Sequence, residues 1–233
     1  MADVTLTYKG STIAEMSNTG TKTLKTAGKY CEGDIGVNYV KPSSGGTSDD
    51  LAIKVIEGEG AITELPSRIT KIRDYAFHTG PLANFTVLPN GITDIGKYAF
   101  YDNTPNITFL PRSLKNIGEY AFYQVVRGSV GDSLRTISLP DGLLTIGNFA
   151  FANNKYLKLT SIPGSVISIG AYAFQNCTSL TTLTLKGTPT SIASGAFKAC
   201  TNLTTINVPW AEGAVAGAPW GATNATIHYN YTT

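Results

Sequence analysis

The segment LPNGITDIGKYAF (88–100) decides the fold, because close versions of it recur along most of the chain. Nearly every version begins on Leu-Pro or Ile-Pro, and every version ends on Ala-Phe. The closing aromatic residues are Phe77, Phe100, Phe122, Phe151, Phe174 and Phe197. Their spacings are 23, 22, 29, 23 and 23 residues, and a further step of 23 residues reaches Trp220. A period of this length predicts a solenoid in which each repeat forms one coil.

Each repeat carries two local patterns. In SLTTLTL (179–185), before the turn, leucines alternate with threonines, which predicts a half-buried β-strand. The strands before Leu88 and Leu110 fit better one residue earlier, with Val87 and Phe109 as their apolar positions. After the turn, Ile95, Tyr98 and Ala99 have i, i+3, i+4 spacing, which predicts a short helical turn. We therefore expect stacked parallel β-strands connected by short helical turns.

The repeats define the domain organisation. Residues 51–233 are predicted to form the solenoid, with an N-terminal cap at 51–64 and a C-terminal cap at 208–233. Stacking would align the closing aromatic residues, including Trp220, in one buried column worth roughly 2–3 kcal/mol per phenylalanine. Residues 1–41 hold three short strand-like runs and are expected to form a small β-module for docking or oligomerisation. The segment PSSGGTSDD (42–50) is typical of a flexible linker.

Composition excludes several classes of function. The net charge is +2 and no basic run is present, so we expect neither a nucleic-acid partner nor an anionic membrane surface. No apolar stretch approaches the ~20 residues of a membrane span. The first residues have no continuous apolar core and the last have no hydrophobic tail, so no secretory signal or anchor is expected.

The chain shows no recognisable catalytic or metal-binding pattern. The two histidines, His78 and His228, stand apart, and the 16 acidic residues do not recur at one repeat position. We therefore predict no enzymatic activity, no cofactor and no metal. Cys177 and Cys200 occupy the same repeat position, and they could form a disulfide or a metal pair. Two buried small apolar side chains are the favoured interpretation, because a metal needs about four ligands.

Two columns of side chains are candidates for binding. The first is the polar strand column with the Trp that follows it: Thr136, Ser138, Thr182, Thr184, Thr205, Asn207 and Trp210. Its hydroxyls would lie on one flat sheet surface suited to protein or glycan contact, or would simply be solvated. Trp210 would be exposed there or would plug the end of the solenoid. The second column is Tyr75, Tyr98, Tyr120, Phe149 and Tyr172. It could stack on sugars, but a core with hydroxyls at its rim is favoured.

The repeated motif IG-x-Y-A-F…C-x-x-L-x-x-I-x-L-P resembles the BspA-type leucine-rich repeat of bacterial surface proteins and phage-encoded proteins. The resemblance covers roughly residues 60–230 and implies a leucine-rich-repeat-like solenoid. The chain departs from ordinary leucine-rich repeats because it lacks their regular Asn column after the strand. The run TKTLKTAGKYC–DIGVNYV (21–40) is similar to short modules of phage tail and other virion proteins.

These resemblances imply a non-catalytic binding protein, most plainly a phage virion component such as a tail, baseplate or head fibre. Residues 1–41 would contact other virion proteins, and the solenoid would bind a host surface protein or glycan. Such appendages are commonly homo-oligomers, and lysis would release the virion from the cell. The alternatives are a bacterial cell-surface BspA-like adhesin and an intracellular interaction scaffold. A glycoside hydrolase would need two converging carboxylates, which the repeat does not supply.

Overall fold

The computed structural model describes the following residues with their side chains: 70–78, 87–103, 107, 109–124, 134 and 136–232. The N-terminal strands β1 (Val4–Tyr8), β2 (Ser11–Met16), β3 (Lys22–Leu24), β4 (Gly36–Val40) and β5 (Leu51–Glu57) are described by their backbone. The 29-residue interval between Phe122 and Phe151 is predicted to hold an insertion near Gln124–Asp132. Its residues 125–132 and the expected linker at 42–50 lie outside the described residues.

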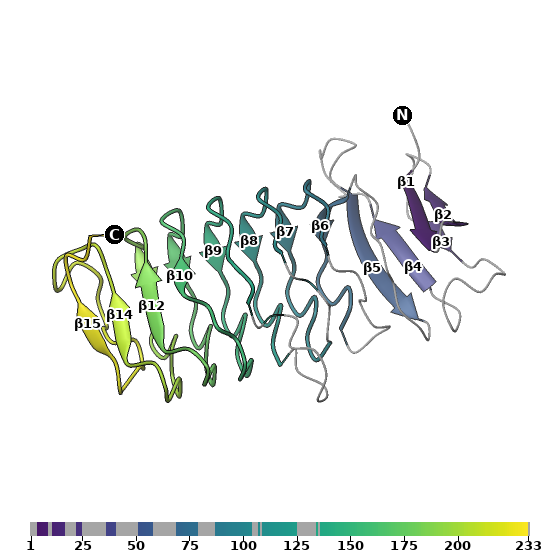
Figure 1. Cartoon of the computed structure of the whole chain (residues 1–233). Helices are drawn as coiled ribbons and strands as arrows, with labels where there is room; N and C mark the ends of the chain where they lie inside the picture. The colour runs from purple at the N-terminus through teal and green to yellow at the C-terminus, as the bar shows by residue number, and fades with distance from the viewer. Residues whose placement is uncertain are drawn as a thin grey trace.

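The predicted parallel solenoid is confirmed. One sheet has the order β13-β11-β9-β8-β7-β6-β5-β4-β3, and a second has the order β10-β12-β14-β15. The solenoid strands of the first sheet are β6 (Ile69–Ile72), β7 (Asp94–Ile95), β8 (Asn116–Ile117), β9 (Thr145–Ile146), β11 (Ser168–Ile169) and β13 (Ser191–Ile192). Those of the second are β10 (Ser161–Ile162), β12 (Thr182–Leu185), β14 (Thr205–Asn207) and β15 (Thr226–His228). All these strands pair in parallel, and successive coils stack side by side (Figure 1).

The N-terminal strands pair differently. Strands β1 and β2 form a two-stranded antiparallel sheet, whereas β3, β4 and β5 pair antiparallel within the nine-stranded sheet. Strand β5 then pairs in parallel with β6. The division into module, linker and solenoid stays a prediction.

The expected helical turn after each short strand is wrong. Tyr98 has a φ of 54°, in the left-handed region, which interrupts a right-handed helix. The backbone N–H groups alternate in direction here: Ala99 donates to Gly96 O within its coil, whereas Phe100 donates to Ala121 O of the next coil. The same turn recurs at Tyr120, Phe149 and Tyr172, with φ between 54° and 56°. Bonds between coils therefore replace the i→i−4 bonds of a helix.

An aromatic column, made of Phe77, Phe100, Phe122, Phe151, Phe174 and Phe197, forms the centre of the core. Each side chain is at most 1% exposed, and neighbouring rings stack with centroids 5.0–5.5 Å apart. Trp220 is also 1% exposed, and its carbonyl accepts a hydrogen bond from the Phe197 N–H at 3.0 Å. The last coil therefore continues the stack, and each ring covers the next.

Glycine lets the coils approach closely beside this column. A Cβ on Gly147 would lie 2.6 Å from Glu119 N and from Gly118 C, and one on Gly170 would lie 2.5 Å from Asn148 N. These distances are shorter than any carbon side chain allows, so glycine at these positions serves close backbone approach rather than a positive φ.

A column of hydrogen-bond donors follows the phenylalanines. Asn154 Nδ2 donates to Phe122 O at 2.7 Å and to Phe151 O at 2.8 Å. Cys177 Sγ donates to Phe151 O at 3.2 Å, and Cys200 Sγ donates to Phe174 O at 3.0 Å. Asn103 donates in the same way to the first phenylalanine of the column. The described residues thus hold a mixed Asn and Cys column after the turn, whereas ordinary leucine-rich repeats have their Asn column after the strand.

Candidate binding groove

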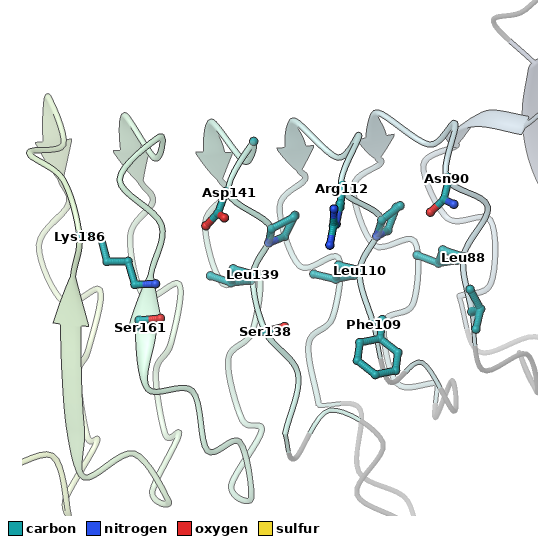
Figure 2. A pocket seen from close by; sticks show the side chains of 14 residues that line it. Leu88, Asn90, Phe109, Leu110, Arg112, Ser138, Leu139, Asp141, Ser161 and Lys186 are labelled. Atoms are coloured by element: carbon teal, nitrogen blue, oxygen red, sulfur yellow. The ribbon is translucent and has the colours of Figure 1, made fainter. Parts of the chain in front are cut away.

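A groove of about 930 Å³ runs along the solenoid where the segments before the repeated prolines meet the following turns. We call it the binding groove. Its side chains come from five successive coils and lie in chain order along the solenoid (Figure 2). They are Val87, Leu88, Asn90, Phe109, Leu110, Pro111, Arg112, Ser138, Leu139, Pro140, Asp141, Gly142, Ser161 and Lys186.

The groove arises from the register of the segments before each proline. Leu88 and Leu110 are buried, which turns Val87 and Phe109 outward, 58% and 66% exposed. Val87 and Phe109 form a parallel bridge, so the two apolar side chains belong to neighbouring coils. The expectation that Val87 and Phe109 are the apolar, inward-facing positions of these two strands is therefore wrong. Phe109 supplies an exposed aromatic face beside the groove (Figure 2).

Three charged side chains line the groove. Arg112, Asp141 and Lys186 are all exposed, and within the described part of the chain none of them forms an ion pair. Arg112 and Asp141 occupy equivalent places on neighbouring coils, and Lys186 lies two coils beyond Asp141. Their charges are therefore available to a ligand, in the order positive, negative, positive along the solenoid.

The polar strand column lies partly in the groove. Ser138 lines it, and Thr136, Ser138 and Thr182 are exposed. Thr184 and Thr205 are half-buried, in strands that pair in parallel in the four-stranded sheet. The column therefore provides an accessible row of hydroxyls that extends from the groove along the four-stranded sheet.

Asn207 and Trp210 do not belong to this exposed row, since both are only 6% exposed. Asn207 Nδ2 donates to Thr184 Oγ1 at 3.3 Å. Trp210 packs edge-on against Trp220, with ring centroids 6.4 Å apart. Trp210 therefore lies inside the end of the solenoid, which is one of the two placements expected for it. The last coil covers its side chain.

The second candidate column, which runs from Tyr75 to Tyr172, is a continuous stack of rings and not an open surface for stacking on a ligand. Neighbouring rings from Tyr75 to Tyr172 stack 4.6–5.1 Å apart, so each ring face is covered by the next ring. A second rank of His78, Tyr101 and Tyr123 stacks beside it. Partial burial, followed by the neighbouring tyrosines, raises the pKa of Tyr101 and of Tyr120. Stacked faces cannot also stack on a sugar, so this column is part of the framework.

Both described cysteines are free and buried. Burial raises the pKa of the Cys177 thiol well above its usual range, with a further contribution from Cys200, and burial raises the pKa of Cys200 to about 12. Such thiols stay protonated and act as hydrogen-bond donors rather than nucleophiles. The part of the chain described with side chains holds no group of three or more His, Cys, Asp or Glu side chains placed to bind a metal ion. It also holds no helix with the length and hydropathy to cross a bilayer.

The fold and groove define a solenoid of the leucine-rich-repeat class. Residues 61–127 and 130–212 match, in six copies, the family described as "BspA type Leucine rich repeat region", and the chain belongs to that family. No curated protein matches the sequence significantly.

Two solved structures are similar to this chain. One is a leucine rich cell surface protein from Faecalibacterium prausnitzii, with 20% identity and a TM-score of 0.42, covering 76% of this chain and 39% of its own. The other is a leucine-rich repeat protein from Bacteroides ovatus, with 18% identity and a TM-score of 0.32, covering 73% of this chain and 60% of its own. The chain thus spans less than two thirds of either protein.

Proposed function

We propose that this chain is a non-catalytic binding protein that attaches the particle or cell carrying it to a surface. The observation that carries the proposal is the binding groove, in which exposed Phe109 and Arg112 share one coil and exposed Asp141 and Lys186 follow on later coils. The side chains of these residues lie outside the buried core, and exposed apolar surface rimmed by polar groups marks a site of interaction. They are the features expected of a surface that another molecule covers.

The carrier is proposed to be a phage virion, with residues 1–41 contacting other virion proteins and the solenoid contacting a host surface protein or glycan. The support is the similarity of residues 21–40 to virion modules. A homo-oligomer would present several grooves at once and strengthen weak attachment. The alternatives are a bacterial cell surface, which suits the BspA-type family, and an intracellular scaffold. Mass spectrometry of induced particles and of cell envelopes distinguishes them: the chain in envelopes and absent from particles would contradict the virion assignment.

Attachment itself can be measured with fluorescent beads coated with the full chain and incubated with whole cells of the producing strain and its relatives. We expect wild-type beads to bind cells and beads carrying Phe109→Asp to bind far fewer. Lys155→Asp, an exposed charge reversal outside the groove lining, is the matched control and should bind as wild type does. Equal binding by Phe109→Asp and wild type would contradict a role for the groove in attachment.

A further inference from the structure

We propose that the binding groove takes an extended acidic peptide segment of a partner protein, in which one apolar residue is followed by two acidic residues four positions apart. The proposal rests on the proposed binding function and specifies its ligand. It follows from the length of the groove, from its order of charges and from the kind of apolar surface it exposes.

The length of the groove matches an extended chain. Its lining spans five coils, from the one holding Leu88 to the one holding Lys186. Parallel coils repeat about every 4.8 Å, so four steps cover about 19 Å. An extended peptide rises about 3.3 Å per residue, so six residues cover the same distance. A ligand lying along the solenoid can therefore contact all five coils at once.

The charges set the spacing of the acidic residues. Arg112 and Lys186 lie three coils apart, which corresponds to about 14 Å at 4.8 Å per coil. In an extended peptide, side chains at i and i+4 point to the same face about 13 Å apart. Two acidic residues with that spacing reach both cations. The residue at i+2 lies about 6.6 Å beyond the first acidic residue, and the nearest coil is that of Asp141, about 4.8 Å from the coil of Arg112. That residue would be basic.

The apolar end of the groove determines where the apolar residue of the peptide lies relative to the two acidic residues. Val87 pairs in parallel with Phe109 and belongs to the preceding coil, which lies on the side of Arg112 away from Asp141. A peptide residue two positions before the first acidic residue reaches these exposed apolar side chains. Val87 and Phe109 together offer an aliphatic and an aromatic surface on which an apolar peptide side chain can pack. The row of Arg112, Asp141 and Lys186 favours a charged peptide over a neutral sugar. The inferred pattern is apolar-x-acidic-x-basic-x-acidic.

The test is fluorescence polarisation of the full chain with a fluorescein-labelled peptide Gly-Leu-Ser-Glu-Ser-Lys-Ser-Glu-Gly. We expect saturable binding that weakens about tenfold in Arg112→Glu and in Lys186→Glu, since each reversal places like charges opposite each other. Lys155→Glu is the control and should bind as wild type does. A peptide with both glutamates adjacent, at the same composition, should bind more weakly because only one can reach a cation.

A charge exchange separates a specific contact from a general loss of positive charge. Replacing the glutamate nearer the leucine by lysine should abolish binding to wild type and restore binding to Arg112→Glu. Thermal unfolding followed by tryptophan fluorescence should be the same for all variants, because Arg112 and Lys186 are exposed and unpaired in the described residues.

Absence of peptide binding to the wild-type chain, or equal binding of both peptides, would overturn the inference. The proposed attachment function would survive that result if Phe109→Asp beads still failed to bind cells. If periodate oxidation of the cells then abolished attachment of wild-type beads, the ligand would be a glycan. If Phe109→Asp beads bound as wild type does, the proposed role of the groove would fail as well.

Discussion

The two sides of each coil differ in how closely they repeat. On the side of the nine-stranded sheet, Gly118, Gly147 and Gly170 each donate a 2.8 Å backbone hydrogen bond to the isoleucine of the preceding coil. The following turn repeats within 2° of φ in four coils. On the other side, the outward position before each proline changes from Val87 and Phe109 to Ser138 and Ser161. The inward positions of both sides are buried, whereas the outward position before each proline carries different chemistry from coil to coil.

The largest effect should come from the aromatic column. Phe151→Ala should lower the free energy of unfolding by about 3–5 kcal/mol, because it leaves a cavity between two stacked rings. Urea unfolding followed by tryptophan fluorescence measures the loss. Tyr156→Ala, at a side chain 49% exposed, is the control and should change stability little. A loss below about 1 kcal/mol for Phe151→Ala would contradict a shared core.

Two glycine substitutions compare one position on each side of the coil. The comparison is between positions, because Gly187 on the groove side also leaves no room for a Cβ beside the Gly164 backbone. Gly170→Ala should cost about 3 kcal/mol, because its Cβ would meet the backbone of the preceding coil at 2.5–2.6 Å. Gly164→Ala, on the side of the groove, would meet Lys186 O at 3.1 Å and should cost about 1 kcal/mol. The same urea titration ranks the two variants. Equal costs would mean that Gly164 and Gly170 pack equally tightly.

The donor column can be tested at Asn154. Asn154→Ala removes the amide that donates to Phe122 O and Phe151 O, and should cost about 1–3 kcal/mol because buried carbonyls lose their partner. Asn154→Cys restores one donor, as at Cys177, and should recover part of the loss. Chemical denaturation of the three proteins gives the order wild type, Cys, Ala. If Ala and Cys variants were equally stable, the donor would not matter.

A smaller effect is expected at alkaline pH. The pKa of the Cys200 thiol is raised from 9.0 to about 12 in the folded protein. The unfolded thiol therefore ionises first, and the stability it contributes is complete below pH 9 and is lost as the pH rises towards 12. The double variant Cys177→Ser, Cys200→Ser should lose stability less steeply over this range, as measured by denaturation at several pH values. Parallel profiles would contradict the raised pKa.

The sequence predicted the solenoid and the period of its aromatic column, because buried phenylalanines recur at fixed spacing. It failed at the turn after Ile95, where the spacing of Tyr98 and Ala99 suggested a helix. A local pattern does not reveal that Phe100 donates its N–H to the next coil, nor that Tyr98 adopts a positive φ.

The groove was harder to predict than the fold. The polar alternation predicts the outward position of Ser138. Phe109 is predicted to be an apolar strand position because the alternation of its repeat fits better one residue earlier, and the structure places it outward. Arg112, Asp141 and Lys186 are isolated in sequence, and only the stacking of coils brings them into one row. The polarity of Asn207 predicts an exposed side chain. Asn207 is instead buried, and its amide donates a hydrogen bond to Thr184 Oγ1.

The separation of folding from binding is tested most directly at Phe109, by measuring the unfolding free energy and the cell attachment of one variant. Phe109→Ala should unfold within about 0.5 kcal/mol of wild type, as expected for a surface substitution, while beads that carry it attach to far fewer cells. A loss of stability close to that of Phe151→Ala, with attachment unchanged, would show that Phe109 belongs to the core and contradict the account.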